Sequence, residues 1–468
     1  MVERRQKVEQ FREENKQLKR KLKRREPALL AKEVEDNETE ITIKIATRNV
    51  GPVIKVVAKL CGKNVKNIPS RQVVDTFVDR KLAITQKHVG TAAAASSNTT
   101  LYSDETRKHG YTYETYIISD DKQNSYILGL REMANKSGAS TAETLQQIIQ
   151  DISVYCTQSD NLGLGYDLLT NIKNTMSDRA STEKTFNGMF DKVIDNYDQL
   201  SEDEKNLCGQ MNNFFCGLHL LVTIADVCET STSKFENNYE SGDLGSASDP
   251  HLTRKVCAVG EDERNGASKQ WKTYLQTKND KNRIKRFNHN RYNIMFMEGS
   301  ALFYHSADIA DFPDNVHGAS NDALKAVSLD IKEDLYLAGA KAHGLISKFS
   351  LSPLWRFIEA PGHILDMKTT FNTHINFLER AASDQSMTEH FITGEVSPFE
   401  TEVNEKDVVM KKLIENHRVD EIVMPLMQNI FIAIKQLLQR MIPEHLQGGK
   451  CWEPSDELRK TTKSAKKQ

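Results

Sequence analysis

Three β-type segments near residue 100 constrain the fold of this chain more than any other feature. They are rich in β-branched and aromatic residues, and turn-type residues separate them at His109-Gly110 and at 120–124. The predicted strands are 99–106, 111–119 and 125–131. Short segments of this composition, joined by tight turns, predict three consecutive antiparallel strands.

Helices alternate with further strands after this predicted three-stranded unit. A capping box at Ser140–Glu143, followed by apolar residues at helical spacing, predicts a helix. A strand ending at Asp178, a helix carrying Phe186 and Phe190, and a short strand at 214–216 complete the series. This order is similar to that of the ribonuclease H-like fold, in which the first and fourth strands are neighbours. We therefore expect a mixed α+β class with a ribonuclease H-like sheet and helices.

Asp104 and Asp178 each stand where a predicted strand meets a polar turn. If the two strands are neighbours, the two carboxylates can bind the same divalent metal. Mg²⁺ prefers hard oxygen ligands, and paired ions about 4 Å apart can hold both the attacking and the leaving oxygen of a phosphoryl transfer. The alternative is structural: Asp104 would be a turn residue, and Asp178 would cap a helix that begins near Ser181.

Cys216 and His219 follow the last predicted strand with the spacing of half a zinc site, but no second ligand pair matches them. Cys216 lies beside two phenylalanines, which favours a structural role. His219 is either a core histidine or a phosphate contact. The seven cysteines are odd in number and contain no Cys-x-x-Cys pair, so neither a disulfide framework nor a zinc ribbon is indicated.

The charge of the chain is unevenly distributed, although the net charge is only −2. One basic cluster lies at the N-terminus and a second lies between residues 278 and 291. The second cluster contains Lys278, Lys281, Arg283, Lys285, Arg286 and Arg291. Such clusters neutralise DNA phosphates and make binding salt-dependent, although each can also be a solvated surface.

A basic helix with a short heptad seam is predicted for residues 1–34. The seam residues are Val8, Phe11, Asn15, Leu18 and Leu22. Their 3,4 spacing predicts a short coiled coil that makes a dimer, and an asparagine in such a seam fixes the register. A single solvated helix is the alternative. No apolar run approaches the length of a membrane span, and the chain begins without a hydrophobic leader, so we expect an intracellular protein that does not contact membranes.

Several motifs of the chain resemble those of the hAT superfamily of cut-and-paste DNA transposases and of transposon-derived proteins related to it. The motifs are 101–110, 127–131, 172–184, 290–296, 353–359 and above all Cys216-Gly-Leu-His219-Leu-Leu-Val. The resemblance implies that Asp104 and Asp178 are the first two members of an acidic catalytic triad. It also implies that Cys216 and His219 position DNA beside them. No motif identifies the third acid, and Glu359, Glu415 and Glu444 are the candidates.

The sequence patterns, with the resemblance for the insertion domain, give the expected domain organisation. The expected segments are the heptad helix at 1–34, a helical pair at 46–92, the ribonuclease H-like core at 98–230, a loop-rich basic segment at 231–290, a helical continuation at 291–350, an incomplete helical insertion domain at 351–445 and a disordered tail at 446–468. The zinc-finger domain that usually begins hAT proteins is replaced here by the heptad helix. The chain is expected to stop inside or just after the insertion domain.

Two functional hypotheses follow from these residues. The first is a nuclear transposase that cleaves and joins DNA with Mg²⁺ or Mn²⁺ as cofactor and acts as a homo-oligomer. The second is a catalytically inactive, dimeric DNA-binding protein derived from such an enzyme. The absence of an identifiable third acid leaves both hypotheses open.

Overall fold

The computed structural model describes residues 47–65, 67–108, 110–133, 137–157, 163–178, 211–240, 267–285, 294–312, 327, 329–400 and 407–467. The chain forms two compact units, Met1–Lys81 and Leu82–Gln468. The predicted heptad helix of 1–34 lies outside the described residues, as does the helix predicted after Asp178. Arg286 and Arg291 of the basic cluster also lie outside them.

The first unit contains α2 (Thr47–Leu60) and the start of α3 (Arg71–Ala94), so the helical pair expected at 46–92 is present. Ser70 caps α3, because its hydroxyl oxygen accepts a hydrogen bond from the Val73 amide at 3.3 Å. Several large apolar side chains on these two helices are exposed. They include Val56, Val57, Leu60, Phe77 and Val78.

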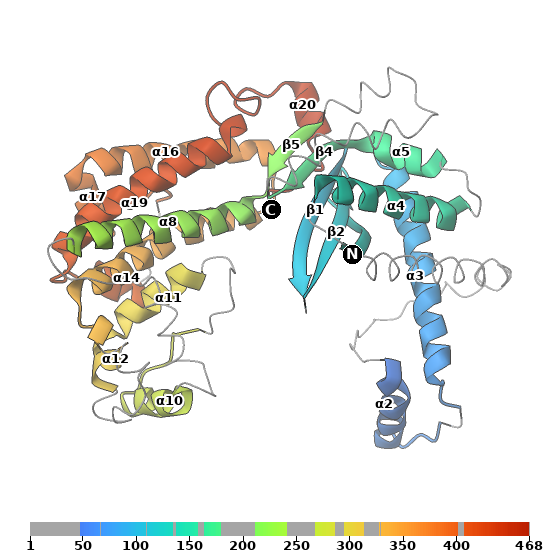
Figure 1. Ribbon diagram of the computed structural model, residues 1–468, viewed down its shortest axis with the longest axis horizontal. Coiled ribbons are helices and arrows are strands. Elements are labelled where there is room, and N and C mark those ends of the chain that lie inside the picture. The colour runs from blue at the N-terminus through green and yellow to red at the C-terminus, as the bar shows by residue number, and fades with distance from the viewer. Residues whose placement is uncertain are drawn as a thin grey trace, which may run out of the picture. The chain divides into compact units, whose positions relative to one another are not determined.

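The second unit contains one five-stranded mixed sheet with the strand order β3-β2-β1-β4-β5 (Figure 1). The strands are β1 (Thr99–Lys108), β2 (Tyr111–Ser119), β3 (Ser125–Met133), β4 (Ile172–Ser177) and β5 (Asn212–Phe215). The first three strands pair antiparallel, whereas β1, β4 and β5 run parallel. The structure therefore confirms the three predicted antiparallel strands, the adjacency of the first and fourth strands, and the mixed α+β class.

Helices α4 (Gly138–Thr157) and α5 (Gly163–Asn171) supply the core on one face of this sheet (Figure 1). Their apolar residues recur at helical spacing, and Leu145, Ile148 and Ile152 are fully buried against the strands. Burial of each such side chain contributes about 1.5–3 kcal/mol. The N-terminal cap of α4 is Ser137, whose hydroxyl accepts from the Ser140 amide at 3.2 Å, so the helix begins one turn before the predicted capping box.

The C-terminal segment covers the opposite face of the sheet and corrects the prediction of a disordered tail at 446–468. Helix α20 (Asp456–Thr461) leads into a stretch in which Thr462, Ser464 and Ala465 are buried. The Ser464 hydroxyl is hydrogen-bonded to that of Thr100 at 2.7 Å. The Lys- and Ser-rich composition of this segment predicted disorder. The segment is nevertheless ordered, because its polar side chains and carbonyls find partners on strands more than 280 residues earlier in the chain.

Replacing Ser464 with alanine is expected to lower the free energy of unfolding by about 1–3 kcal/mol, because buried polar partners would lose their bonds. The Ser464 hydroxyl also donates to the carbonyl of Asn98 and accepts from the Asn174 side chain at 3.3 Å. Urea denaturation would measure the change. Ser383→Ala is the matched control, since that hydroxyl is exposed at a helix end, and equal losses in the two variants would contradict the prediction.

The remainder of the second unit is helical and is built around a single apolar core. Its elements are α8 (Gly217–Glu240), α10 (Ser268–Thr277), α11 (Ile294–Tyr304), α12 (Ser306–Phe312), α14 (Asp334–Ile346), η3 (Ser347–Leu351), α15 (Ser352–Glu359), η4 (Ile364–Asp366), α16 (Met367–Ser383), α17 (Gln385–Ile392), α18 (Val408–Ile414), α19 (Asp420–Met441) and η5 (Pro443–His445). The helical character expected from 291 to 445 is confirmed for the described residues.

Helix α8 follows β5 directly, packs on α19 and α14, and thereby joins the sheet to the helical core. It runs to Glu240, so residues 231–240 are not the loop that the low apolar content predicted. One face carries Thr232 and Glu236, both buried, and Phe235 stacks on Tyr239 with ring centroids 5.8 Å apart. Polar residues hold this face in place: the Thr232 hydroxyl and His343 Nε2 are hydrogen-bonded at 3.0 Å.

Helix α19 is long and apolar enough to cross a membrane, alone among the helices of the described ranges. Many of its apolar residues lie in the helical core, although Ile432 is exposed. The buried residues are Val423, Leu426, Met427, Ile430, Phe431, Ile434, Leu437 and Leu438. This burial within the protein is the arrangement of a core helix.

Candidate active site

The register of the parallel strands brings Asp104 and Asp178 to the same level of the sheet. Tyr102 of β1 pairs with Met176 of β4, so two residues further along each strand stand Asp104 and Asp178. Residues two apart on a strand share a face, and neighbouring strands are about 4.8 Å apart. The two aspartates therefore lie side by side on one face, Asp178 directly after the end of β4 and Asp104 within β1, which continues to Lys108.

Cys216 extends the same row across the third parallel strand. Ser177 pairs with Phe215 in β5, and the Cys216 amide donates to the Ser177 carbonyl at 2.9 Å. Asp104, Asp178 and Cys216 thus form a row across the three parallel strands: Asp178 and Cys216 directly follow β4 and β5, and Asp104 lies within β1. The carboxyl edge of parallel strands is where ligands bind in open α/β sheets.

His219 approaches this row from the first turn of α8. Its Nε2 atom lies 3.9 Å from Asp104 Oδ1, and 29% of the His219 side chain is exposed. The hydrogen bond to the Cys216 side chain raises the pKa of His219, burial opposes that shift, and the charges of Asp104 and Asp178 raise the pKa further. The imidazole therefore keeps its proton to a higher pH than a free histidine does.

Asp104 faces solvent beside this histidine, with 67% of its side chain exposed. Loss of hydration raises the pKa of Asp104, the nearby His219 charge lowers it, and repulsion from Asp178 adds to the rise. Two carboxylates at neighbouring positions repel each other unless a cation lies between them. Their hard oxygen atoms fit Mg²⁺ or Mn²⁺, and these two residues would hold the ion.

The three candidates for a third acid lie in different parts of the helical region. Glu415 ends α18 and pairs with Lys412 at 2.8 Å, and Glu444 is buried in η5. Glu359 is exposed in the last turn of α15. Its neighbour Ile358 packs so closely on the start of α8 that a Cβ added at Gly217 would stand 3.0 Å from Ile358. Glu359 is therefore the candidate whose helix, α15, contacts the start of α8 beside Cys216.

The basic cluster at 278–285 is partly neutralised by internal ion pairs. Lys278 Nζ lies 2.6 Å from Asp308 Oδ1, and an Arg283 nitrogen lies 2.6 Å from Asp280 Oδ1. Lys281 and Lys285 are exposed. Within the described part of this cluster, Lys281 and Lys285 are therefore better placed than Arg283 to contact phosphate.

The C-terminal segment borders the site, which sequence patterns did not predict. The Lys466 amide donates to the Tyr102 hydroxyl at 2.8 Å, two residues before Asp104 on the same face of β1. The Lys467 carbonyl oxygen lies 2.6 Å from the position that a Cβ on Gly217 would take, so glycine is required there. Burial raises the pKa of Tyr102 to about 12, which keeps its hydroxyl protonated.

The local sequence does not predict this contact between the C-terminal segment and β1, because Tyr102 and Lys466 are far apart in the chain and polar residues at both positions are ordinary.

Comparison of the sequence with protein-family models and with curated proteins returns no match.

Proposed function

We propose that this protein is a metal-dependent polynucleotidyl transferase with a ribonuclease H-like core, related to the hAT transposases and acting on DNA in the nucleus. The single observation that carries the proposal is the strand register that sets Asp104 of β1 beside Asp178, which directly follows β4. The strand order β3-β2-β1-β4-β5, with the last three strands in that order parallel, is the order expected of such a core.

The residues of the site have distinct roles in this proposal. Asp104 and Asp178 would bind Mg²⁺ or Mn²⁺. A bound ion of this kind polarises the phosphate and activates the attacking oxygen. His219, with its raised pKa, donates a hydrogen bond to a non-bridging phosphate oxygen, and Cys216 orients the imidazole through its own hydrogen bond.

A non-catalytic, DNA-binding dimer of transposase origin is the second candidate. It is favoured by the position of Glu105, an acid whose charge acts on Asp104. Glu105 follows Asp104 directly in β1, so its side chain points to the opposite face of the sheet. It is therefore not the third member of a triad, and a site with two acids binds the metal less completely.

Asp104→Asn and Asp178→Asn test the catalytic proposal in an assay of supercoiled plasmid nicking with Mg²⁺ and with Mn²⁺. Each variant is expected to nick at least about 100-fold more slowly, because a metal ligand and its charge are lost. Asp167→Asn, an exposed carboxylate on α5, is the matched control and should keep wild-type activity. Equal nicking rates for the wild type and Asp104→Asn would reject the proposal that this site is catalytic.

DNA binding measured in EDTA separates the second candidate from the first. The non-catalytic protein would bind DNA with the same affinity in wild type and in Asp104→Asn, and would lose affinity steeply as salt rises. Binding that is absent, or that does not depend on salt, would reject this candidate. Nicking lost in Asp104→Asn, with binding unchanged, would favour the first candidate by showing metal-dependent strand cleavage at this site.

A further inference from the structure

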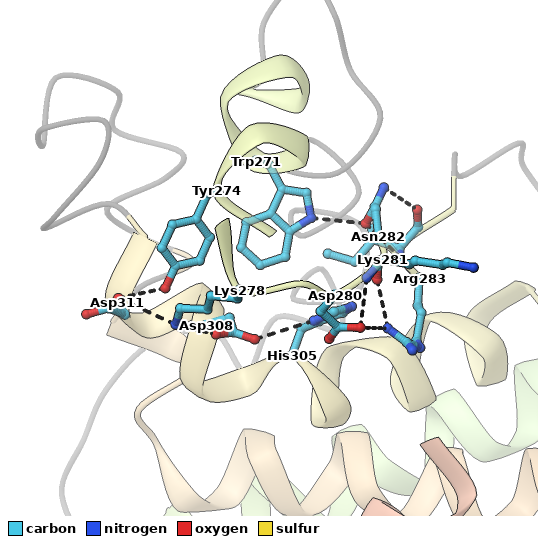
Figure 2. Close-up of polar contacts among 11 residues, drawn as sticks. Trp271, Tyr274, Lys278, Asp280, Lys281, Asn282, Arg283, His305, Asp308 and Asp311 are labelled. Atoms are coloured by element: carbon cyan, nitrogen blue, oxygen red, sulfur yellow. Dashed lines mark hydrogen bonds and ion pairs between the residues drawn. The ribbon is translucent and has the colours of Figure 1, made fainter. Parts of the chain in front are cut away.

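A second group of potential metal ligands lies in the helical region and is formed by Asp280, His305 and Asp308. Asp280 follows α10, His305 lies between α11 and α12, and Asp308 is in the first turn of α12. One ligand atom from each residue lies within 4.8 Å of the other two. Figure 2 shows the three side chains converging from these separate segments.

The imidazole of His305 is fully buried, and neither of its ring nitrogens has a hydrogen-bond partner. Its Nδ1 atom points toward Asp308 Oδ2 but remains 3.7 Å away, which is beyond hydrogen-bonding distance. Buried polar side chains are nearly always paired, so a group without a partner calls for an explanation, and an ion is one such explanation. A cation between His305 and the two carboxylates would satisfy the ring.

The two carboxylates are oriented by other residues, as metal ligands usually are. Lys278 and Arg283 each bind an Oδ1 atom, that of Asp308 and that of Asp280 respectively, both at 2.6 Å. The Oδ2 atom of Asp308 is the one that faces His305. With Asp311 included, three carboxylates face two cationic side chains, so the group retains a negative charge that favours a cation.

Aromatic rings enclose the histidine and shield it from water. Trp271 meets the His305 ring edge-on with centroids 5.6 Å apart, and Tyr304 does so at 4.8 Å. The Trp271 indole is itself fixed by donating to the Asn282 side chain at 3.0 Å (Figure 2). An apolar shell of this kind limits solvent access to a metal site and holds its ligands still.

We propose that Asp280, His305 and Asp308 bind one Zn²⁺ ion, with water as the fourth ligand. Zn²⁺ accepts one imidazole and two carboxylates in tetrahedral geometry at about 2.0–2.2 Å. Three atoms at most 4.8 Å apart can stand no more than about 2.8 Å from a common centre, so an inward shift of at most about 0.7 Å each closes the site. Small side-chain rotations provide that shift.

Zinc at this position would fix the loop after α10 to the start of α12. That loop carries the exposed side chains of Lys281 and Lys285, so metal binding would order a basic surface segment. This role is separate from catalysis at Asp104 and Asp178, which belong to the sheet.

Isothermal titration of the full-length, metal-stripped protein with ZnCl₂ tests the proposal. Wild type is expected to bind a single equivalent at this site, and His305→Gln and Asp308→Asn are expected to bind about 10–100-fold more weakly or not at all. His374→Gln, which removes another buried histidine, should bind like wild type. Asp104→Asn should also leave this binding unchanged.

Co²⁺ provides a second readout that does not depend on the folding of a single variant. Its visible absorption should appear in wild type and be lost in Asp308→Asn, and it should quench Trp271 fluorescence because that indole touches His305. Trp271→Phe should remove the quenched signal but keep Zn²⁺ binding. Absence of both Zn²⁺ heat and Co²⁺ absorption in wild type, or binding by His305→Gln equal to that of wild type, would overturn the proposal.

Discussion

Acidification from pH 6.5 to pH 4 is expected to destabilise the protein steeply, because His343 and His374 are buried in their neutral form. Burial lowers the pKa of His343 to about 4 and that of His374 to about 3, from an ordinary value of 6.5. The unfolded chain binds both protons below pH 6.5, whereas the folded protein does not, so acid favours unfolding. Stability is therefore full above pH 6.5 and falls as pH drops toward 4.

The expected loss is about 2–3 kcal/mol per pH unit for the two histidines together, since each contributes about 1.4 kcal/mol per unit in this window. Urea denaturation at a series of pH values would measure it. In the double variant His343→Gln/His374→Gln the slope should flatten, because glutamine can still bond the hydroxyls of Thr232 and Ser350 but does not titrate. His390→Gln, with 48% of its side chain exposed, is the control. A double variant that kept the wild-type slope would refute the assignment.

Removing Asp420 is expected to cost far more stability than removing its partner Lys341. The Lys341 side chain is fully buried, lies 2.6 Å from Asp420 Oδ1 and donates to the Glu415 carbonyl at 2.9 Å. Asp420→Asn leaves a buried ammonium without its counter-charge and is expected to cost about 3–5 kcal/mol, whereas Lys341→Met, an apolar replacement of similar length, should cost much less. Thermal and urea denaturation of both variants would establish the order.

The cost of Asp420→Asn should shrink as pH rises. Burial already lowers the pKa of Lys341 from its usual 10.5, and loss of Asp420 removes the interactions that oppose this shift. Between the folded and unfolded pKa values the unfolded chain binds the proton and the folded chain does not, so stability of the variant rises toward pH 10.5. Asp334→Asn, which breaks an exposed pair with Arg418, should cost less than about 1 kcal/mol at any pH. Similar losses of stability in Asp420→Asn and Asp334→Asn would contradict the prediction.

The strands and the first helix of the second unit were predictable from sequence because their signals are local. Turn residues at His109-Gly110 and 120–124 bound β1, β2 and β3, and apolar spacing defines α4. The adjacency of Asp104 and Asp178 followed from element order alone, since few topologies accommodate it. The ends of elements were less exact: β1 and β3 each continue two residues beyond their predicted ends.

Features that depend on distant partners escaped prediction. The segment after Thr461 is polar and basic, and it is ordered only because Thr100, Ser119 and Asn174 offer it bonds on the sheet. Helix α8 extends past residue 231 because polar Thr232 finds His343 more than 100 residues away. Periodicity within a window does not contain such information.

The two groups of potential metal ligands also differ in how far the sequence predicted them. The sequence pattern placed Asp104 and Asp178 near the ends of predicted strands and so suggested a site, although β1 continues to Lys108. Asp280, His305 and Asp308 have no motif spacing, and only the packing of α10, α11 and α12 brings them together. A buried histidine whose ring nitrogens have no hydrogen-bond partner is a signal that only a structure can show.

The seating of Lys467 has a practical consequence for how this protein is handled. Its carbonyl oxygen lies against Gly217, one residue from Cys216 and two from His219. An affinity tag or fluorescent reporter attached directly after Lys467 would therefore lie beside that histidine and would restrict access to the candidate site.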